Sequence, residues 1–462
     1  MSFFLDIVNS WKNIEGSVNS NEDLLNWIDN LNKTTFVKIN ECSINSGNFW
    51  FYDDYNGEVL NRKRSFFSIV GMRYFEKGEF ISEQPIILQP EIGYLGFICR
   101  KINGVLNFLI QAKIEPGNVN CVQLSPTLQA TKSNFTRAHG GNLPLYFDLF
   151  EDESKYTVIY DQIQSEQATR FYKKRNRNKI ILLDHDFEIH PNYKWMTLGQ
   201  IKELMKINNL VNMDTRTVIS GIPLFTSVIN NNEKKMIKCL FSDEAFFNSL
   251  FNADYYEYLP RVYQKLNDYK MFNDRLISRV PLNQLADWNI DEYGITCRKK
   301  SNFIVKYYDI SISGREVQRW IQPLFKAIGM ATFGLITRKK NDKREFLVRI
   351  TPEIGSFDKV EIGPSIQWEP SHDFANSNEI DVEFKKQVDS KEGILYDVIL
   401  SEEGGRFFHE QNRNVIIEFD HAMISSIPED YMWVDFATLN FLVQNNNCLN
   451  IQLRNLLSLL QI

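Results

Sequence analysis

The chain of 462 residues is longer than one hydrophobic core usually supports, so its length predicts two or more domains. A net charge of −6 gives no electrostatic reason to expect a nucleic-acid-binding protein. The six cysteines include no CxxC pair, which argues against a zinc ribbon and against a disulfide framework. Because the N-terminal stretch has no basic segment like that of a signal peptide, and no apolar run approaches a membrane span, we expect a cytoplasmic protein.

The predicted elements begin with helices and continue with short strands. Residues 1–35 carry apolar side chains at helical spacing, and residues 36–122 show short strands separated by turns. Within the second of these ranges, a hairpin-like unit begins at residue 108 and is interrupted by Pro and Gly at 115–118. This hairpin carries several long amide side chains with one Lys and one Glu, a composition typical of a polar pocket wall. A plain hydrated hairpin is the alternative.

Further along the chain, residues 179–183 predict a buried strand and residues 198–210 an amphipathic helix. The polar run 230–235 is a candidate linker. Residues 244–276 are again helical in character, and strands and turns follow them. This order of elements predicts an α+β protein with mixed sheets flanked by helices.

The second part of the chain repeats the first. Glu115 recurs as Glu353 and Gln129 as Gln367, each 238 positions later. The register then slips by two residues, so that Arg170 recurs as Arg406. So long a period indicates a duplicated domain rather than a solenoid. We therefore expect two tandem domains at residues 1–230 and 236–462.

Polar positions that occur in only one copy are candidates for chemistry in that copy. Three positions of the first copy, each given with the residue that replaces it in the second, are Gln111 (Arg349), Lys113 (Thr351) and Asn118 (Ser356). This comparison favours a main catalytic site in the first copy and a diverged second pocket in the other.

Several familiar catalytic motifs are absent from the sequence. It has no GxGxxG after a strand, no P-loop, no HExxH and no GxSxG. The histidines show no short metal-ligand spacing, so no metal site is expected. The acidic cluster that would hold Mg²⁺ for pyrophosphate hydrolysis is also missing, and residues 401–405 (SEEGG) form only a fragment of one.

A set of short motifs covers nearly the whole chain. In the first copy these are Gln84-Pro85, 111–118 (QAKIEPGN), 123–131 (QLSPTLQAT), Ser133-Asn134, 139–141 (HGG), Ser165-Glu166, Arg170-Phe171 and 174–178 (KRNRN). In the second copy they are 314–317 (GREV), 320–323 (WIQP), 401–407 (SEEGGRF) and Trp433. Together they resemble the NDP-hexose 2,3-dehydratases of deoxysugar pathways. One departure is 167–169 (QAT), where family members more often resemble the Glu-Gly-Gly run at 403–405.

The resemblance implies two tandem domains related to Nudix hydrolases, without the working hydrolase box, in a homodimer. It implies a hydro-lyase that eliminates water across C2–C3 of a dTDP-4-keto-6-deoxyhexose and yields a 3,4-diketo-2,6-dideoxy sugar nucleotide. It also implies a nucleotide-sugar pocket in each copy. The alternatives are a Nudix-type nucleotide-sugar hydrolase and a non-catalytic nucleotide-sugar-binding protein.

The chemistry of this reaction suggests roles for the side chains. The C4 ketone makes the C3 hydrogen acidic, a base removes it, and the C2 hydroxyl leaves with help from an acid. No redox cofactor is required, and the sequence leaves open which residue is base and which is acid. The candidate catalytic residues are Lys113, Glu115 and His139. The candidate substrate-binding residues are Gln111, Asn118, Thr127, Gln129, Thr131, Asn134, Arg170, Lys174, Arg175 and Arg177. The candidate residues of the second pocket are Arg349, Gln367, Arg406 and Arg413.

Overall fold

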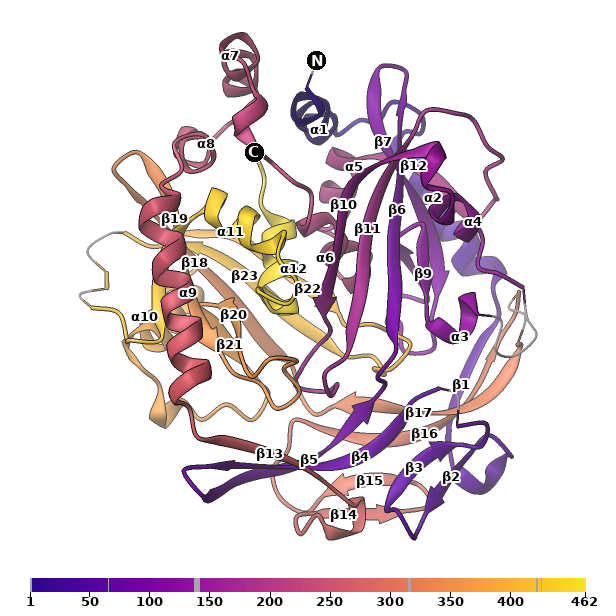
Figure 1. The fold of residues 1–462 in the computed structure, drawn as a ribbon. Helices are drawn as coiled ribbons and strands as arrows, with labels where there is room; N and C mark the ends of the chain where they lie inside the picture. The colour runs from indigo at the N-terminus through magenta and orange to yellow at the C-terminus, as the bar shows by residue number, and fades with distance from the viewer. Residues whose placement is uncertain (1, 65, 137–141, 315–316, 421–422, 425) are drawn as a thin grey trace.

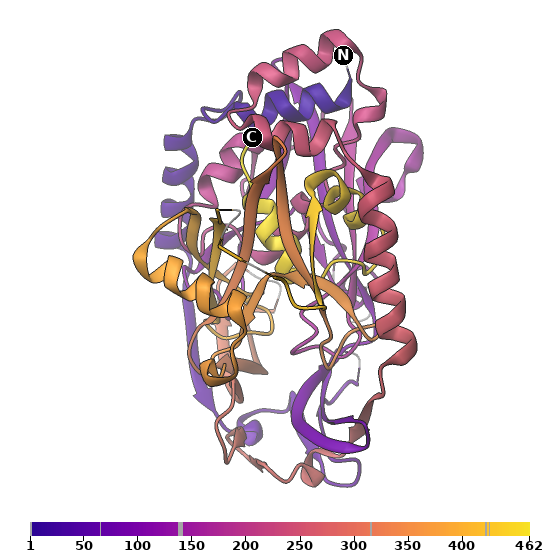
Figure 2. The same ribbon diagram turned by 90° about the vertical axis from the view of Figure 1, so that its left-hand side faces the viewer.

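The computed structural model describes residues 2–64, 66–136, 142–314, 317–420, 423–424 and 426–462, which form two similar halves (Figures 1 and 2). Each half has one seven-stranded mixed sheet, and two smaller five-stranded sheets lie beside them. The expected α+β class with two similar halves and mixed sheets is confirmed. None of the helices in the described ranges is both long and apolar enough to cross a membrane.

The large sheet of the first half contains the predicted hairpin. β6 pairs in parallel with β11, whereas the other strand pairs of the sheet are antiparallel. Lys113 on β7 lies opposite Gln123 on β8, so the predicted strand–turn–strand unit is confirmed. The strands are β6 (Ile92–Ile102), β7 (Val105–Ile114), β8 (Val122–Ser125), β9 (Leu128–Ala130), β10 (Tyr156–Ser165), β11 (Arg175–Leu183) and β12 (Tyr193–Thr197).

The large sheet of the second half repeats this arrangement. β18 pairs in parallel with β23, as β6 does with β11. The strands are β18 (Ala331–Lys340), β19 (Lys343–Thr351), β20 (Glu361–Pro364), β21 (Ile366–Trp368), β22 (Ile394–Ser401), β23 (Gln411–Glu418) and β24 (Tyr431–Asp435).

The two small sheets exchange a strand between the halves. β1 (Val37–Cys42) of the first half pairs with β16 (Phe303–Ile312) of the second, and β13 (Arg275–Val280) of the second pairs with β4 (Ser68–Glu76) of the first. β1 and β13 are equivalent strands of the repeat, so the exchange is reciprocal. The other strands of these sheets, at the bottom of Figure 1, are β2 (Trp50–Asp53), β3 (Glu58–Asn61), β5 (Glu79–Leu88), β14 (Trp288–Asp291), β15 (Gly294–Cys297) and β17 (Arg319–Ala327).

The helices follow the sequence pattern with three differences. The predicted helix at 198–210 ends early, the helical stretch 244–276 divides into α8 and α9, and the polar run expected as a linker forms α7. Asn230 caps α7 by accepting from the backbone of Glu233, which explains how so polar a run begins a helix. The helices are α1 (Phe3–Lys12), α2 (Asn21–Thr34), α3 (Lys132–Phe135), α4 (Phe147–Glu151), α5 (Leu198–Leu204), α6 (Met213–Ser220), α7 (Asn231–Leu240), α8 (Glu244–Phe251), α9 (Tyr255–Phe272), α10 (Glu379–Ser390), α11 (Phe436–Val443) and α12 (Ile451–Leu459).

One hydrophobic core runs through both halves, with α6 and α12 packed against each other between the large sheets (Figure 1). Two buried arginines cross the boundary there. Arg216 donates to the carbonyl of Ser401 at 2.6 Å, and its equivalent, Arg454, donates to the carbonyl of Ser165. The halves of the repeat therefore share a core and its buried polar contacts.

Candidate active site

The turn that follows β7 packs against a turn of the other half. The amide of Gly117 donates to the carbonyl of Gly404 at 2.7 Å, and the amide of His409 donates to the carbonyl of Gly117 at 2.9 Å. A Cβ atom at Gly117 would lie 1.6 Å from the carbonyl oxygen of Phe407, so only glycine allows this approach. The turn between β22 and β23 is thereby fixed against the predicted polar hairpin.

An equivalent contact joins the hairpin of the second half to the turn between β10 and β11 of the first half. The amide of Gly355 donates to the carbonyl of Ala168 at 2.8 Å, and the amide of Lys173 donates to the carbonyl of Gly355 at 2.8 Å. Each hairpin thus meets the turn of the other half, and two composite polar sites result.

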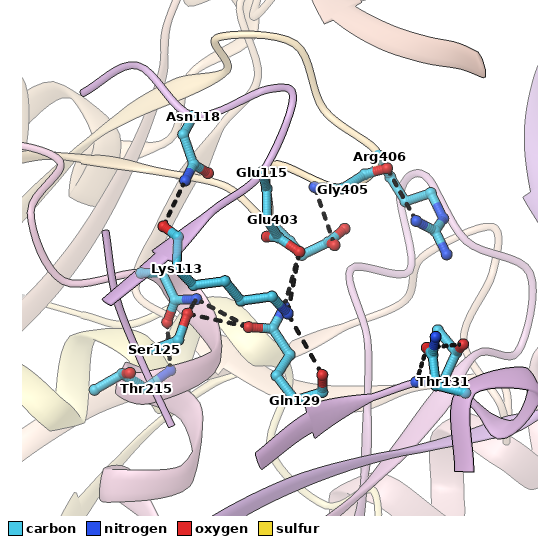
Figure 3. Close-up of polar contacts among 12 residues, drawn as sticks. Lys113, Glu115, Asn118, Ser125, Gln129, Thr131, Thr215, Glu403, Gly405 and Arg406 are labelled. Carbon is cyan, nitrogen blue, oxygen red and sulfur yellow. Dashed lines mark hydrogen bonds and ion pairs between the residues drawn. The ribbon is translucent and has the colours of Figure 1, made fainter. Parts of the chain in front are cut away.

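The first site is built around Lys113, Glu115 and Gln129, whose side chains point toward one another in Figure 3. Lys113 Nζ lies 3.4 Å from Glu115 Oε1 and donates to the carbonyl oxygen of Gln129 at 3.4 Å. Gln129 Nε2 donates to Glu115 Oε1 at 3.3 Å. One carboxyl oxygen of Glu115 therefore faces both a cation and an amide donor.

A chain of hydrogen bonds orients the Gln129 amide. Ser125 Oγ donates to Gln129 Oε1 at 3.2 Å, and Asn212 Nδ2 contacts both Ser125 Oγ at 2.7 Å and Gln129 Oε1 at 3.3 Å. Asn212 is the N-cap of α6 and accepts from the amide of Thr215 at 2.8 Å. The start of a core helix thus positions a polar group of the first site.

Glu403 enters the first site from the second half (Figure 3). Its Oε1 accepts from the amide of Gly405 at 3.1 Å. Burial and the neighbouring Glu115 raise the pKa of Glu403 to about 8, against the opposing effects of Arg406 and Lys113. Burial, with nearby carboxyl groups, also raises the pKa of Asp214 on α6 well above its usual value. The first site therefore gathers several carboxyl groups in a poorly solvated region.

Two buried cations lie beside these carboxyl groups. Arg406 donates to Gln89 Oε1 from Nε at 3.3 Å and from Nη2 at 3.1 Å. Lys174 Nζ donates to the carbonyl of Glu91 at 2.7 Å, and burial lowers the pKa of Lys174 to about 8. Arg406, expected in the second pocket, thus stands next to Glu403 in the first.

The second site is a cavity of about 400 Å³ lined by residues of both halves. Arg170, expected in the first pocket, lines this one, where its Nη2 lies 3.0 Å from Glu369 Oε2. Gln367 Nε2 donates to Glu353 Oε1 at 2.7 Å, and burial raises the pKa of Glu353 to about 7. Arg349 also lines the cavity. Arg170 and Arg406 occupy equivalent positions in the repeat. Each lies in the pocket expected for the other, because each turn packs on the hairpin of the opposite half.

Two predicted binding residues use their side chains to hold the backbone. Thr127 Oγ1 donates to the carbonyl of Leu109 and accepts from the amide of Ile98 at 3.0 Å. Asn118 Nδ2 donates to the carbonyl of Lys113 at 3.3 Å and to that of Cys121 at 2.9 Å. Both residues support the polar hairpin from within.

The remaining predicted residues have other partners or positions. Three predicted arginines lie on strands of the large sheets. Arg177 donates to Asp161 at 2.7 Å, and Arg413 donates to Asp397 at 2.8 Å. The guanidinium group of Arg175 lies 3.6 Å from the centroid of the Phe357 ring. Thr131 Oγ1 contacts Asn134 Oδ1 at 2.6 Å at the start of α3. Gln111 lies on β7 opposite Ser125. His139 lies outside the described residues.

Sequence reasoning missed Glu403, Asp214 and Asn212. The sequence signal for Glu403 was the difference between the Glu-Gly-Gly run at 403–405 and its counterpart at 167–169. Because each of these turns packs on the hairpin of the other half, this difference in sequence becomes a difference between the two sites. Asp214 and Asn212 gave no signal of this kind, because they resemble ordinary helix-start residues. In the ranges that the structure describes, no three His, Cys, Asp or Glu side chains are grouped so that they could hold a metal ion.

Comparison with known proteins identifies the family. The sequence model of the NDP-hexose 2,3-dehydratase family matches residues 21–222 and 260–460. The chain belongs to this family. Each half thus carries one copy of the family's sequence pattern, in agreement with the repeat.

Relatives from three organisms match nearly the full chain, and each is named dTDP-4-dehydro-6-deoxy-α-D-glucopyranose 2,3-dehydratase. The Saccharopolyspora spinosa protein is 33% identical over 94% of this chain and 89% of its own length. The Streptomyces violaceoruber protein is 32% identical over 88% and 90%. The Amycolatopsis orientalis protein is 31% identical over 95% and 89%.

A solved structure matches a smaller part of this chain. The crystal structure of C. elegans Ap4A hydrolase covers 25% of this chain and 86% of its own, at 15% identity and a TM-score of 0.19. The family assignment does not depend on this match.

Proposed function

We propose that the chain eliminates water across C2–C3 of dTDP-4-keto-6-deoxyglucose or a closely related sugar nucleotide, giving a 3,4-diketo-2,6-dideoxy sugar. The observation that carries the proposal is the convergence of Lys113, Glu115 and Gln129 in the first site. The chain belongs to a family of 2,3-dehydratases, which agrees with it. The shared name of three relatives that match nearly the whole chain supports this substrate.

The side chains of the first site suit the first step of this reaction. Glu115, which faces Lys113 and Gln129 through one oxygen, is the base that takes the C3 proton. Lys113 and the Gln129 amide stabilise the negative charge that develops on the C4 oxygen. Because partly buried groups interact more strongly than solvated ones, their placement between the halves increases this effect.

Buried cations supply a binding site for the diphosphate. Arg406 and Lys174 lie beside the first site, and a guanidinium group fits phosphate oxygens well. The second site, with Arg170 and Arg349, is a further pocket for a nucleotide sugar. Its Thr351 occupies the position of Lys113, which supports assigning the elimination to the first site.

The proposed function is tested by incubating the protein with dTDP-4-keto-6-deoxyglucose in deuterated buffer, with and without a chelator, and following the sugar by NMR. Loss of water with deuterium entering C2 is the expected result. A cleaved diphosphate would indicate a nucleotide-sugar hydrolase. A bound but intact sugar would indicate a protein that only binds its ligand. Either of these results would overturn the proposal.

We also propose that the protein is a cytoplasmic homodimer whose tandem repeats are residues 1–230 and 236–462. Six free thiols suit a reducing compartment, and the family matches at 21–222 and 260–460 support the repeat boundaries. Sedimentation of the purified protein at twice the mass of the 54.2 kDa chain is expected, and a monomer at micromolar concentration would contradict the dimer.

A further inference from the structure

We propose that Glu403, contributed by the second half, is the acid that protonates the departing C2 hydroxyl in the first site. The inference rests on the proposed dehydration and adds to it the residue that acts on the leaving group. It assigns one catalytic function to both halves of the chain, since the base belongs to one half and the acid to the other.

The geometry brings two carboxyl groups to one point. A Cβ atom at Gly405 would lie 2.2 Å from Glu403 Oε1 and 3.4 Å from Glu115 Oε1, so oxygens of both side chains converge on this glycine. A Cβ atom at the preceding residue, Gly404, would lie 2.2 Å from Asn118 Oδ1. The two glycines therefore let the turn approach the hairpin closely enough to present Glu403 beside Glu115.

The two carboxyl groups have different surroundings. Glu115 Oε1 faces the ammonium group of Lys113 and the amide donor of Gln129. Glu403 Oε1 accepts a backbone hydrogen bond from Gly405 at 3.1 Å, and burial and Glu115 raise the pKa of Glu403 to about 8. Neighbouring carboxyl groups whose environments separate their pKa values can serve as base and acid at the same pH.

The second site lacks this pair. Gln167 stands where the first site has Glu403, and Thr169 stands where it has Gly405. Glu353 keeps the position of Glu115, but an amide cannot donate a proton to a leaving hydroxyl as a carboxylic acid can. The repeat therefore provides an internal comparison in which the carboxyl group of Glu403 has no equivalent in the second site, where the carboxyl group near Glu353 is Glu369, paired with Arg170.

The proton balance of the reaction closes within the pair. Glu115 takes the proton from C3, and the electron pair of the C3–H bond forms the enolate with the C4 carbonyl. When the enolate collapses, the C2–O bond breaks, its electron pair leaves with the oxygen, and the proton of Glu403 completes the departing water. Glu115 has then gained one proton and Glu403 has lost one, so transfer between the neighbouring groups restores the starting state.

The decisive experiment compares Glu403→Gln with Glu115→Gln in deuterated buffer with dTDP-4-keto-6-deoxyglucose. In Glu403→Gln, water loss should fall about 10²- to 10⁴-fold, while deuterium still enters C3 of the unreacted substrate because the base remains. In Glu115→Gln, both C3 exchange and water loss should fall. The counterpart Gln167→Ala, in the other turn, should keep more than half of the wild-type rate of water loss.

Three results would overturn the inference. They are wild-type water loss in Glu403→Gln, loss of C3 exchange in a folded Glu403→Gln protein, and equal losses in Glu403→Gln and Gln167→Ala. If Glu403→Gln does not fold, Glu403→Asp carries the test, since the shorter acid should slow water loss more than C3 exchange, and equal slowing would overturn the inference. Wild-type protein that neither exchanges nor dehydrates would instead refute the proposed function.

Discussion

At the scale of single residues, two ionisable side chains of the first site have uncharged counterparts in the second. Lys113 of the first site corresponds to Thr351 of the second, and Glu403 corresponds to Gln167. The shared residues Glu115 and Glu353 are held by equivalent amides, Gln129 and Gln367. The scaffold of a polar pocket is therefore common to both halves, whereas Lys113 and Glu403 occur only in the first site.

Replacing Lys113 by alanine tests this asymmetry. Lys113→Ala removes the cation that lies beside Glu115 and that would stabilise the negative charge on the C4 oxygen of the substrate. We therefore expect kcat to fall about 10²- to 10³-fold. Thr351→Ala, at the equivalent position, should lower kcat far less. Steady-state rates of water loss measure both variants, and equal losses would contradict the assignment of the chemistry to the first site.

The pH dependence of kcat tests the protonation of Glu403. Because burial and Glu115 raise the pKa of Glu403 to about 8, the acid is protonated below that pH and loses its proton as the pH rises through it. Turnover should therefore decline as the pH rises above about 8. The groups that set this value also include Arg406, Glu166 and Lys113. In Glu403→Gln the decline near pH 8 should disappear, and an unchanged profile would assign that decline to another group.

At the scale of elements, the reciprocal packing of hairpins on turns decides what each site contains. The sequence predicted the hairpin of β7 and β8, the repeat and the polar side chains, because these depend on local pattern and on self-similarity. It could not predict which half each turn would contact. The hairpins of the repeat share one pattern, as do the turns, so a local reading assigns Arg170 and Arg406 to their own halves, and the structure places them in the opposite ones.

The glycines of the two hairpin turns test this packing. Gly117→Ala places a Cβ atom 1.6 Å from the carbonyl oxygen of Phe407, and Gly355→Ala places one 1.8 Å from that of Phe171. Each substitution should lower the free energy of unfolding by about 1–3 kcal/mol through overpacking. Denaturant unfolding measures this loss.

Activity should separate the two glycine variants although their stability losses are similar. Gly117→Ala displaces the turn that carries Glu403 and should lower water loss more strongly than Gly355→Ala, which disturbs the second site. Similar losses of activity in both variants would contradict the prediction that the contact of Gly117 matters more for catalysis than the equivalent contact of Gly355.

At the scale of the whole molecule, the repeat is not a pair of independent domains. β1 and β13 complete sheets of the opposite halves, and α6 packs on α12 within one core. The sequence predicted a duplication with a linker, but strand exchange cannot be read from a repeat, since equivalent strands satisfy either sheet equally well. The polar run at the centre forms α7 and does not separate the halves as an extended linker would.

This shared architecture predicts cooperative unfolding. Loss of either half would leave the other with an incomplete small sheet and an exposed core face, so the chain should unfold in one transition. Tryptophan fluorescence and far-ultraviolet circular dichroism should report the same midpoint in denaturant. Two separated transitions would contradict a common core.

We propose that the elimination takes place where the hairpin of one half meets the turn of the other. A crystal structure of the slowly reacting Glu403→Gln protein with dTDP-4-keto-6-deoxyglucose tests it most directly. We predict that the hexose lies between Glu115 and residue 403, with its C4 oxygen toward Lys113. A hexose bound only in the cavity of Arg170 and Arg349, with the first site empty, would contradict the claim.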